Sequence, residues 1–556
     1  MADKLKVLVL DDEKLVRFTI SAYLKGADFT VSDAETPTEA IACLKRERFH
    51  AIVSDVMMGD MDGFMFRSLV REIDETIPVV FLTSMMNDVG NAFMERVMED
   101  VHSYYVAKSA PRQVLVGKLR QVVKAYVAEL NVRKMERHIA KDLALASFVQ
   151  KAMLPQWVHI DRLYSYTSCF TPYREVSGDL YEWFPVSEDT ALFIGGDIAG
   201  HGTTASLAMT AVQAFLKQFA SIDERRAQRV AKIAQSIHAF LHSNLRDVAY
   251  MVATIVYFDF RNRRGLYLNC GNPGIKVFSR STGKSREINP ENRGALPLGL
   301  FGEAQYRDED VAAFEIGEDD VFVSMSDGIY DISTDPDGID AVPRDIVGEI
   351  ISLAVLQSDA NGRTGLFAAI PNRIMSALSD MGYVHRQDDV SFFVVGANEP
   401  SDGNFLLEVK MRPDLIDEAC RKASVWVSSR YGEETGVRAD LLLNEHLMNI
   451  YRHGLDDFGR QHEVSVVAID LAQDGFCVTV WDRGASWKDV ASETDVEADA
   501  RLEAQNANLA AGGRGRCIVR KIADSISVER FMNLNKTVFR VKRAAGDVDE
   551  RKGEQT

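Results

Sequence analysis

The stretch VLVLDDE (Val7–Glu13) places two aspartates directly after a short apolar run. Further apolar runs of this kind recur along the first 122 residues, with helical patterns between them. These runs are Ala51–Val53, Val79–Leu82 and Tyr104–Val106. Buried strands that alternate with helices form parallel sheets with crossover connections. The sequence therefore predicts a doubly wound α/β domain over residues 1–122.

Polar side chains stand where these predicted strands end. Asp11 and Asp12 follow the first run, Asp55 follows Ala51–Val53, Thr83 follows Val79–Leu82, and Lys108 follows Tyr104–Val106. The carboxyl ends of the strands in a doubly wound sheet converge on one crevice. Clustered carboxylates need a cation, and Mg²⁺ prefers oxygen ligands. We expect a magnesium site at which Asp55 accepts a phosphoryl group, Thr83 donates a hydrogen bond and Lys108 balances the charge.

The motifs in this region resemble those of response-regulator receiver domains. LDDE, SDVMMGDMDGF, FLTS and YYVAK carry the resemblance, which extends over the whole of residues 1–122. It implies that Asp55 is the phosphoacceptor, that Asp11, Asp12 and Asp55 hold Mg²⁺, and that Tyr105 is the aromatic switch residue. It also implies a sensor histidine kinase as the partner that phosphorylates Asp55.

Residues 123–155 are predicted to form a helical linker. Apolar residues recur at alternating spacings of three and four, as in a coiled coil, and the register shifts once, as in a stutter. The second register contains Val132, Met135, Ile139, Asp142, Ala146, Val149 and Met153. The alternative is a single amphipathic helix packed on a neighbouring domain. Leu154-Pro155 should end the helix, and we expect a homodimer that forms through it.

Composition and charge exclude several classes of protein. The chain has 556 residues, with 64 Lys and Arg against 82 Asp and Glu, giving a net charge of −18. Such a charge disfavours nucleic-acid partners. The six scattered cysteines fit a reducing cytosol. The N-terminus lacks a signal-peptide pattern, and the longest uncharged stretch, Ile198–Leu216, contains a Gly-His-Gly turn. We expect a soluble cytoplasmic protein of several domains with no membrane partner.

Residues 156–398 contain short β-type runs and four acidic motifs. The motifs are SGDLYEW with Asp179, GGDIAGHG with Asp197, MSDGIYD with Asp327, and RQDDVSFF with Asp388 and Asp389. Separated carboxylates without His or Cys pairs favour Mg²⁺ or Mn²⁺ over zinc. Two such ions can clamp a phosphate for in-line attack. Because Gly-Asp is also a common turn, spacing alone leaves ordinary loop acids as the alternative.

These motifs resemble the metal-dependent phosphatases of the protein phosphatase 2C class. GDIAGHG, GNPG, ALPLGL, SDGIYD and DDVS occur in the family's order, and they look most like the branch that regulates sigma-factor partner switches. Ser177 and Asn272 depart from the family pattern. The resemblance implies a two-sheet α/β sandwich that hydrolyses phosphoserine with two ions, and Asp388 or its neighbour Asp389 as one ligand. The ligands carried over are Asp179, Asp197, the Ile198 carbonyl, Asp327 and Asp388.

The stretch LLLNEHLMNIYRHG (Leu441–Gly454) predicts a helix whose polar residues share one face. Glu445, Asn449 and His453 recur every four residues. A zinc site is disfavoured because Glu445 and His453 lie two turns apart, about 12 Å along the axis. A nucleotide site is favoured by Asp482 and Gly484, which follow a predicted strand in VWDRG.

The glycines of AGGRGRC (residues 511–517), Gly513 and Gly515 among them, precede a predicted helix and are suited to phosphates. A carboxylate at Asp482 can bind an adenine amino group. Asn449 would then bind Mg²⁺, and Glu445 would act as general base on an attacking hydroxyl.

These C-terminal motifs resemble the GHKL ATPase superfamily, in its anti-sigma-factor serine-kinase branch. The resemblance extends over residues 405–542 and implies an α/β sandwich ATPase over residues 404–545, followed by a tail over 546–556. Thr537 occupies the position of a late family threonine before the last strand.

The order of these regions resembles three-part regulators of bacterial partner switches, of the HsbR and CrsR type. The resemblance implies a protein substrate, a STAS-domain anti-sigma-factor antagonist that carries a phosphorylatable serine. Phosphorylation of Asp55 would shift the balance between hydrolysis of that phosphoserine and its ATP-dependent formation. The alternative is that the C-terminal domain binds ATP without transferring phosphate and sequesters a sigma factor or the antagonist. A sigma or anti-sigma factor is a further expected partner.

Overall fold

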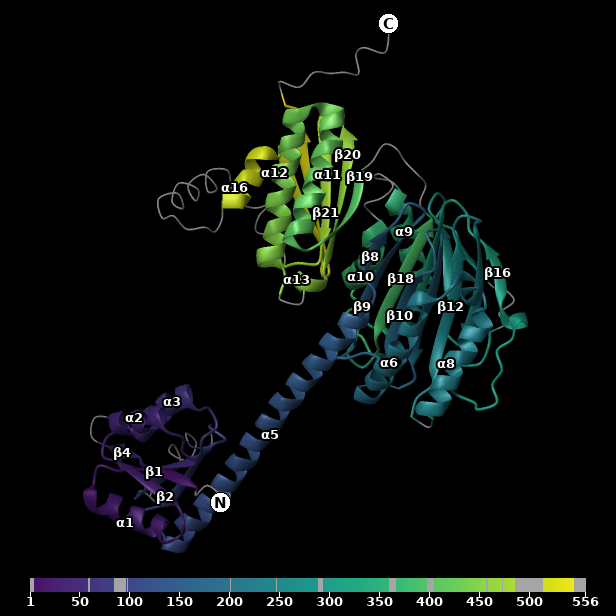
Figure 1. Cartoon of the computed structure of the whole chain (residues 1–556). Coiled ribbons are helices and arrows are strands. Elements are labelled where there is room, and N and C mark those ends of the chain that lie inside the picture. The colour runs from purple at the N-terminus through teal and green to yellow at the C-terminus, as the bar shows by residue number, and fades with distance from the viewer. Residues whose placement is uncertain are drawn as a thin grey trace. The chain divides into compact units, whose positions relative to one another are not determined.

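The computed structural model divides into two compact units, Met1–Asp142 and Leu143–Thr556 (Figure 1). No helix in the described part of the chain is long and apolar enough to cross a membrane. The described residues are 5–58, 61–84, 97, 99–200, 202–246, 248–288, 294–359, 367–397, 405–456, 459–472, 474–485 and 514–544.

The first unit contains a parallel five-stranded sheet with the strand order β2-β1-β3-β6-β7. Helices α2 and α3 pack on one face, and α1 with the first turns of α5 pack on the other. This arrangement confirms the predicted doubly wound fold. The bounds are β1 Lys6–Leu10, α1 Lys14–Lys25, β2 Thr30–Ala34, α2 Pro37–Arg46, β3 Ala51–Asp55, β4 Met57–Met58, β5 Met61–Asp62, α3 Gly63–Ile73, β6 Val79–Thr83 and β7 Ser103–Ala107.

Helix α5 runs without interruption from Arg112 to Met153, and Leu154-Pro155 follows it as expected (Figure 1). Its early apolar residues, such as Leu119, are buried on the receiver sheet. Further along, Met135 is 67% exposed and Leu145 is 64% exposed. A continuous helix agrees with the predicted linker, while a coiled-coil pairing of two copies stays a prediction.

The phosphatase-like region is built from two antiparallel sheets packed face to face. The first has the order β10-β11-β12-β13-β16 and the second β15-β14-β17-β18-β9-β8. Aromatic rings fill the space between them, as where Phe393 packs on Trp183 and Phe193. The strands are β8 Val158–Ile160, β9 Tyr164–Thr171, β10 Asp179–Pro185, β11 Thr190–Ile198, β12 Met251–Asp259, β13 Arg264–Cys270, β14 Ile275–Ser279, β15 Ser285–Glu287, β16 Ala312–Glu315, β17 Asp320–Met325 and β18 Val390–Ala397.

Helices cover the outer face of each sheet. Helices α6 (Thr203–Leu216) and α8 (Val230–Asn244) bury apolar side chains on the first sheet. Helices α9 (Arg344–Asp359) and α10 (Ile370–Asp380) do so on the second. The four layers confirm the expected two-sheet α/β sandwich.

The C-terminal region contains an antiparallel sheet with the order β19-β20-β21-β23-β22. Helices α11 and α12 lie side by side on one of its faces (Figure 1). The stretch around Glu445 lies in α12 as predicted, and a π-helical turn, Ile450–Gly454, ends it. The bounds are β19 Phe405–Lys410, α11 Pro413–Tyr431, α12 Glu433–Asn449, α13 Gly459–His462, β20 Val464–Ala472, β21 Gly475–Asp482, α16 Arg514–Ile522, β22 Ser525–Phe531 and β23 Leu534–Lys542.

Candidate functional site

The first candidate site lies at the carboxyl edge of the parallel sheet. Ligand atoms of Asp11, Asp12 and Asp55 lie within 4.8 Å of one another. The Lys108 ammonium is 2.6 Å from a carboxylate oxygen of Asp55 and 3.4 Å from one of Asp11. Thr83 is buried at the end of β6. The sheet therefore brings the predicted residues together, and three carboxylates fit Mg²⁺.

The charges in this cluster influence one another. Burial raises the pKa of Asp11, and the charge of Asp55 adds to the rise. Burial is the largest single influence on Lys108 and lowers its pKa, but the hydrogen bonds and charges of Asp55 and Asp11 together outweigh burial and raise the Lys108 pKa. Lys108 therefore stays protonated and partly offsets the carboxylates. Tyr105, on β7, is 41% exposed.

The second candidate site is built around the turn Ser177–Asp179. A Cβ atom at Gly178 would lie 2.9 Å from Asp197 Oδ1 and 3.1 Å from the Ile198 carbonyl oxygen. Asp179 and Asp197 are direct partners in the β10–β11 ladder. Glycine is thus required where these oxygen atoms approach the backbone. The arrangement brings three members of the predicted ligand set to one turn.

The remaining predicted ligands, Asp327 and Asp388, act through their charges on Asp197. Burial, followed by the charges of Asp327 and Asp388, raises the pKa of Asp197 to about 8. Burial and then Asp197 raise the pKa of Asp179 well above its usual value. Burial, then Asp389 and Asp327, raise the pKa of Asp388.

Carboxylates that cluster around a buried one, here Asp179, are costly unless cations neutralise them. One carboxylate oxygen of Asp179 is also buried without a hydrogen-bond partner in the described part of the chain. The donor set fits hard divalent ions.

Asp388 and Asp389, which the sequence could not separate, have different surroundings. The two carboxylate oxygens of Asp389 accept hydrogen bonds from the backbone N–H groups of Tyr173 at 2.6 Å and Gly178 at 2.7 Å. One oxygen of Asp388 accepts the N–H of Asp389. Since Asp389 is used to hold the Gly178 turn, the geometry favours Asp388 as the metal ligand. The supporting role of Asp389 has no signal in the sequence.

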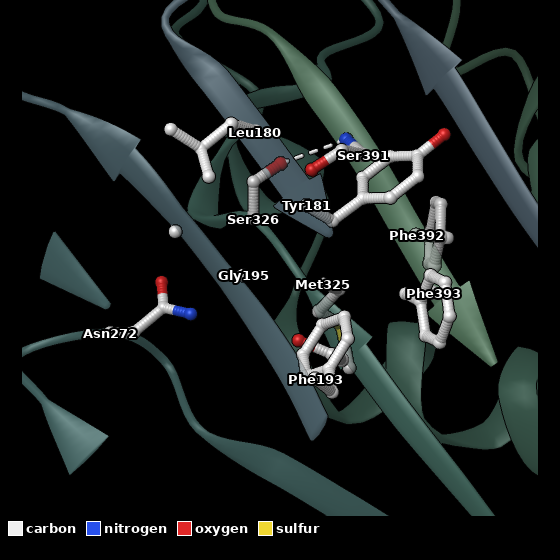
Figure 2. A pocket seen from close by; sticks show the side chains of 12 residues that line it. Leu180, Tyr181, Phe193, Gly195, Asn272, Met325, Ser326, Ser391, Phe392 and Phe393 are labelled. Atoms are coloured by element: carbon white, nitrogen blue, oxygen red, sulfur yellow. Dashed lines mark hydrogen bonds between the residues drawn. The ribbon is translucent and has the colours of Figure 1, made fainter. Parts of the chain in front are cut away.

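A small cavity of about 10 Å³ lies between the two sheets beside this site (Figure 2). The Ser391 N–H donates to the Ser326 hydroxyl at 2.9 Å, and that hydroxyl donates to the Asp389 carbonyl. Asn272, on the cavity wall, donates to the Thr254 hydroxyl. The space holds roughly one water molecule. It is too small for a substrate.

Gln150, near the end of α5, joins this helix to the turn Ser177–Asp179. Its amide nitrogen donates to the carbonyls of Ser177 at 3.0 Å and Ser206 at 3.1 Å, and its amide oxygen accepts from the Ser177 N–H at 3.1 Å. Gln150 is only 2% exposed. The sequence does not predict this contact, because a single glutamine in a helical pattern belongs to no motif.

The third candidate site lies where β21 and β23 run side by side. Oδ1 of Asp482 accepts from the Gly484 N–H at 2.8 Å and from the Asn535 amide at 2.9 Å. Oδ2 of Asp482 and the hydroxyl of Thr537 are both buried without a hydrogen-bond partner in the described part of the chain.

Burial raises the pKa of Asp482 to about 6. Unpaired buried polar atoms are rare and call for an explanation. A carboxylate acceptor beside a hydroxyl fits the amino edge of adenine.

The end of the Glu445 helix contacts this segment. A Cβ atom at Gly484 would lie 3.3 Å from the Gly454 carbonyl oxygen, which itself accepts the Ala485 N–H at 2.9 Å. Glu445 and Asn449 are half-buried on α12. The backbone of the π-helical turn is thus hydrogen-bonded to the loop that follows Asp482. Helix α12, which carries the expected base Glu445 and the expected Mg²⁺ ligand Asn449, therefore adjoins the expected adenine site.

Two other histidines of this region are not candidates for the chemistry. His446 is buried, with its ring 4.9 Å from that of Phe539, and burial lowers the pKa of His446 to about 4. His446 is therefore part of the core of this region. His453 is exposed on the π-helical turn.

Two positional expectations were wrong. Thr537 lies inside the last strand, opposite Val480, and not before it, because β23 already begins at Leu534. Gly515 is the second residue of α16 and does not precede that helix. A residue in the first turn still has an N–H without a partner inside the helix. Gly513 lies outside the described residues.

Three family models match successive parts of the chain. The response regulator receiver domain matches residues 7–120, stage II sporulation protein E (SpoIIE) matches residues 187–398, and the histidine kinase-like ATPase domain matches residues 409–541. The first candidate site lies in the first match. The aspartates at 197, 327 and 388 lie in the second, and Asp482 lies in the third.

The curated relatives match over short stretches. Response regulator Rre1 of Synechocystis is 38% identical over 87 residues, which is 15% of this chain and 38% of that protein. Transcriptional regulatory protein YvrH of Bacillus subtilis is 37% identical over 83 residues, which is 15% of this chain and 35% of that protein. The chain therefore spans well under two thirds of the length of these relatives.

Solved structures are similar over longer stretches. The RsbU and RsbW domains of a Mycobacterium tuberculosis protein cover 70% of this chain and 96% of their own, with 14% identity and a TM-score of 0.38. The SiaA-PP2C domain of Pseudomonas aeruginosa covers 48% of this chain and 99% of its own, with 18% identity and a TM-score of 0.37.

Proposed function

We propose that this chain, a response regulator that joins a receiver domain to a SpoIIE-type phosphatase domain and a histidine-kinase-like ATPase domain, sets the phosphorylation state of one serine in a partner-switching pathway. The substrate is a STAS-domain anti-sigma-factor antagonist. The observation that carries the proposal is the presence, in one compact unit, of a carboxylate cluster around Asp197 and of two polar atoms on the ATPase sheet, Asp482 Oδ2 and the Thr537 hydroxyl oxygen, that are buried without a hydrogen-bond partner in the described part of the chain.

The carboxylate cluster is suited to removing the phosphate. When bound, two Mg²⁺ or Mn²⁺ ions supply the Lewis-acid chemistry of phosphate-ester hydrolysis. Gly178 lets Asp197 and the Ile198 carbonyl approach one backbone turn, and Asp389 holds that turn in place. The proposed ligands are Asp179, Asp197, the Ile198 carbonyl, Asp327 and Asp388.

The ATPase domain is suited to adding the phosphate. Asp482 accepts the adenine amino group and Thr537 bonds the same edge of the base, while Gly513 and Gly515 bind phosphates. Asn449 holds Mg²⁺. Glu445, one helical turn before Asn449 on the same face, takes the proton from the serine hydroxyl.

The receiver would control this balance through α5. A histidine kinase phosphorylates Asp55 in the presence of Mg²⁺, and Lys108 bonds the phosphorylated form. A change in α5 reaches the phosphatase site through Gln150, which bonds both backbone groups of Ser177. The exposed apolar residues of α5, such as Met135 and Leu145, pair with a second copy in a homodimer.

The proposal is tested with the purified antagonist phosphorylated on serine. Asp327→Asn should abolish release of phosphate and spare ATP-dependent phosphorylation of the antagonist. If Asp327→Asn released phosphate at the wild-type rate, the proposed phosphatase site would be wrong.

A second candidate function is ATP-dependent docking without phosphate transfer. It is favoured by the nucleotide-binding features at Asp482, which require only binding. Incubation with radiolabelled ATP and antagonist, beside a pull-down of the same pair, separates the two functions. Capture of the antagonist without label would support docking alone.

A further inference from the structure

Arg483 lies between the two residues of the proposed nucleotide motif, Asp482 and Gly484, yet its side chain contacts the phosphatase domain. One guanidinium nitrogen donates to the Ser168 carbonyl on β9 at 2.7 Å. The guanidinium also lies over the Trp157 ring, 4.7 Å from the ring centre. The Trp157 indole in turn donates to the Val464 carbonyl of β20 at 2.9 Å. Adjacent residues of the chain thus serve the adenine site and the domain interface.

Ser168 connects this interface to the phosphatase metal site. Its hydroxyl accepts a hydrogen bond from the Tyr181 hydroxyl at 3.1 Å. Tyr181 is buried on β10, the strand that begins with the proposed ligand Asp179. Ser168 also pairs with Phe393 on β18, the strand that directly follows Asp388 and Asp389. A displacement of Ser168 should therefore shift β10, which begins at Asp179, and β18, which begins directly after Asp388 and Asp389.

A second contact joins the phosphatase domain to the turn between β22 and β23, beside the proposed adenine site. Asn372 of α10 is fully buried and donates to Asn533 at 2.8 Å, in the turn between β22 and β23. The residues that flank this turn are Arg530, which donates to the Gly484 carbonyl, and Asn535, which donates to Asp482. Both segments that shape the adenine site therefore contact the phosphatase domain.

The interface is close-packed. Trp157 and Ala369 of the phosphatase domain share one buried apolar cluster with Val464, Trp481 and Leu534 of the ATPase sheet. Close-packed interfaces transmit small shifts because they contain no space to absorb them. A change at Asp482 on nucleotide binding should therefore displace β9.

We propose that the nucleotide in the ATPase domain is an allosteric ligand of the phosphatase, with Arg483 as the coupling residue. This inference rests on the proposed nucleotide site at Asp482. It goes beyond that site because it makes the rate of phosphoserine hydrolysis depend on nucleotide occupancy. Coupling between binding equilibria is reciprocal, so a phosphatase-site ligand whose affinity ADP changes must change ADP affinity by the same factor.

The test uses the full chain, ADP as the nucleotide, and p-nitrophenyl phosphate with Mn²⁺ as the phosphatase probe. ADP is chosen because it has no γ-phosphate to transfer. ADP affinity is measured by calorimetry, and kcat/KM is measured with and without saturating ADP. The expected change in kcat/KM is about fivefold or more, as is typical of coupled sites. In Arg483→Ala the change should fall below about twofold while ADP still binds.

Three variants serve as controls. Arg412→Ala removes an exposed arginine of the same domain that pairs with Asp414, and it should keep the full response. Arg483→Lys keeps the positive charge but loses the flat contact with Trp157, and it should show a reduced response even if Arg483→Ala folds poorly. Asp482→Asn should neither bind ADP nor respond, which excludes chelation of Mn²⁺ by free ADP as the cause.

Hydrogen exchange gives a readout that does not depend on turnover. ADP should change the protection of backbone amides in β9 and β10 of the wild type but not of Arg483→Ala. If ADP binds and neither kcat/KM nor exchange changes, the inference is wrong and the nucleotide site stands. If ADP does not bind, the nucleotide site and the inference both fail. If Arg483→Ala keeps the full response, coupling does not pass through Arg483.

Discussion

The side-chain amide of Gln150 bonds both backbone groups of Ser177, donating to its carbonyl at 3.0 Å and accepting from its N–H at 3.1 Å. Gln150 belongs to the last turn of α5, and Ser177 begins the turn that ends at Asp179. The linker helix and the proposed metal site are therefore in direct contact, so a change in α5 can reach the phosphatase through Gln150 and Ser177.

Replacing Gln150 with leucine should impair the phosphatase. Gln150→Leu leaves buried backbone groups of Ser177 unpaired, which costs about 1–3 kcal/mol. Because the turn that ends at Asp179 would then be held less firmly, we expect phosphatase turnover to fall about tenfold, which is about 1.4 kcal/mol of activation free energy, and the Mn²⁺ requirement to rise. Steady-state hydrolysis at several Mn²⁺ concentrations measures both. Lys151→Ala, at the exposed neighbouring position, is the matched control, and equal effects of the two variants would contradict this role.

The two adjacent aspartates should behave differently. Asp388→Asn should weaken Mn²⁺ binding and abolish hydrolysis, because it removes a proposed ligand. Asp389→Asn replaces one of two acceptor oxygens with an amide nitrogen, so it should lower the stability of the fold by about 1–3 kcal/mol and reduce Mn²⁺ binding less. Calorimetry with Mn²⁺ and thermal unfolding separate the two effects. The reverse order of metal affinities would make Asp389 the ligand.

Nucleotide binding should depend on pH through Asp482. Its pKa is raised by burial to about 6, and adenine binding needs the ionised acceptor. The carboxylate is ionised above that pH and protonated below it. ADP affinity should therefore be constant near pH 7.5 and about tenfold weaker at pH 5, one unit below the pKa. Fluorescence titration across this range measures it, and a flat profile would argue against Asp482 as the adenine acceptor.

Phosphorylation of the receiver should require both Mg²⁺ and Asp55. Acetyl phosphate is the donor, and intact-protein mass spectrometry detects the added phosphoryl group. Chelation of Mg²⁺ or the change Asp55→Asn should abolish the modification. Lys108→Ala should reduce it and leave the fold intact, since Lys108 is bonded to Asp55 at the sheet edge. Modification that persists in Asp55→Asn would place the phosphoacceptor elsewhere.

The fold of the first unit and the place of its candidate site could be predicted because parallel strands end at one edge. Asp11, Asp55 and Lys108 are far apart in sequence, but the order of strands alone brings them together. The resemblance to known families likewise supplied the aspartates of the phosphatase site.

The supporting residues could not be predicted in this way. Asn535 lies 53 residues from its partner Asp482, and Gln150 lies 27 residues from Ser177. Their positions depend on antiparallel register and on how a helix docks, and an isolated amide side chain has no pattern that signals either. The separate surroundings of Asp388 and Asp389 likewise depend on backbone groups of a distant turn.

The proposed function has two domains act in opposite directions on the same serine of one partner. To test this directly, the antagonist is phosphorylated with Asp327→Asn protein and ATP, the phosphoserine is located by mass spectrometry, and Glu445→Ala protein is then added without ATP. One serine should gain the phosphate in the first step and lose it in the second. If phosphate persisted on that serine after the second step, or if the second step acted on a different residue, the two domains would not act on one serine.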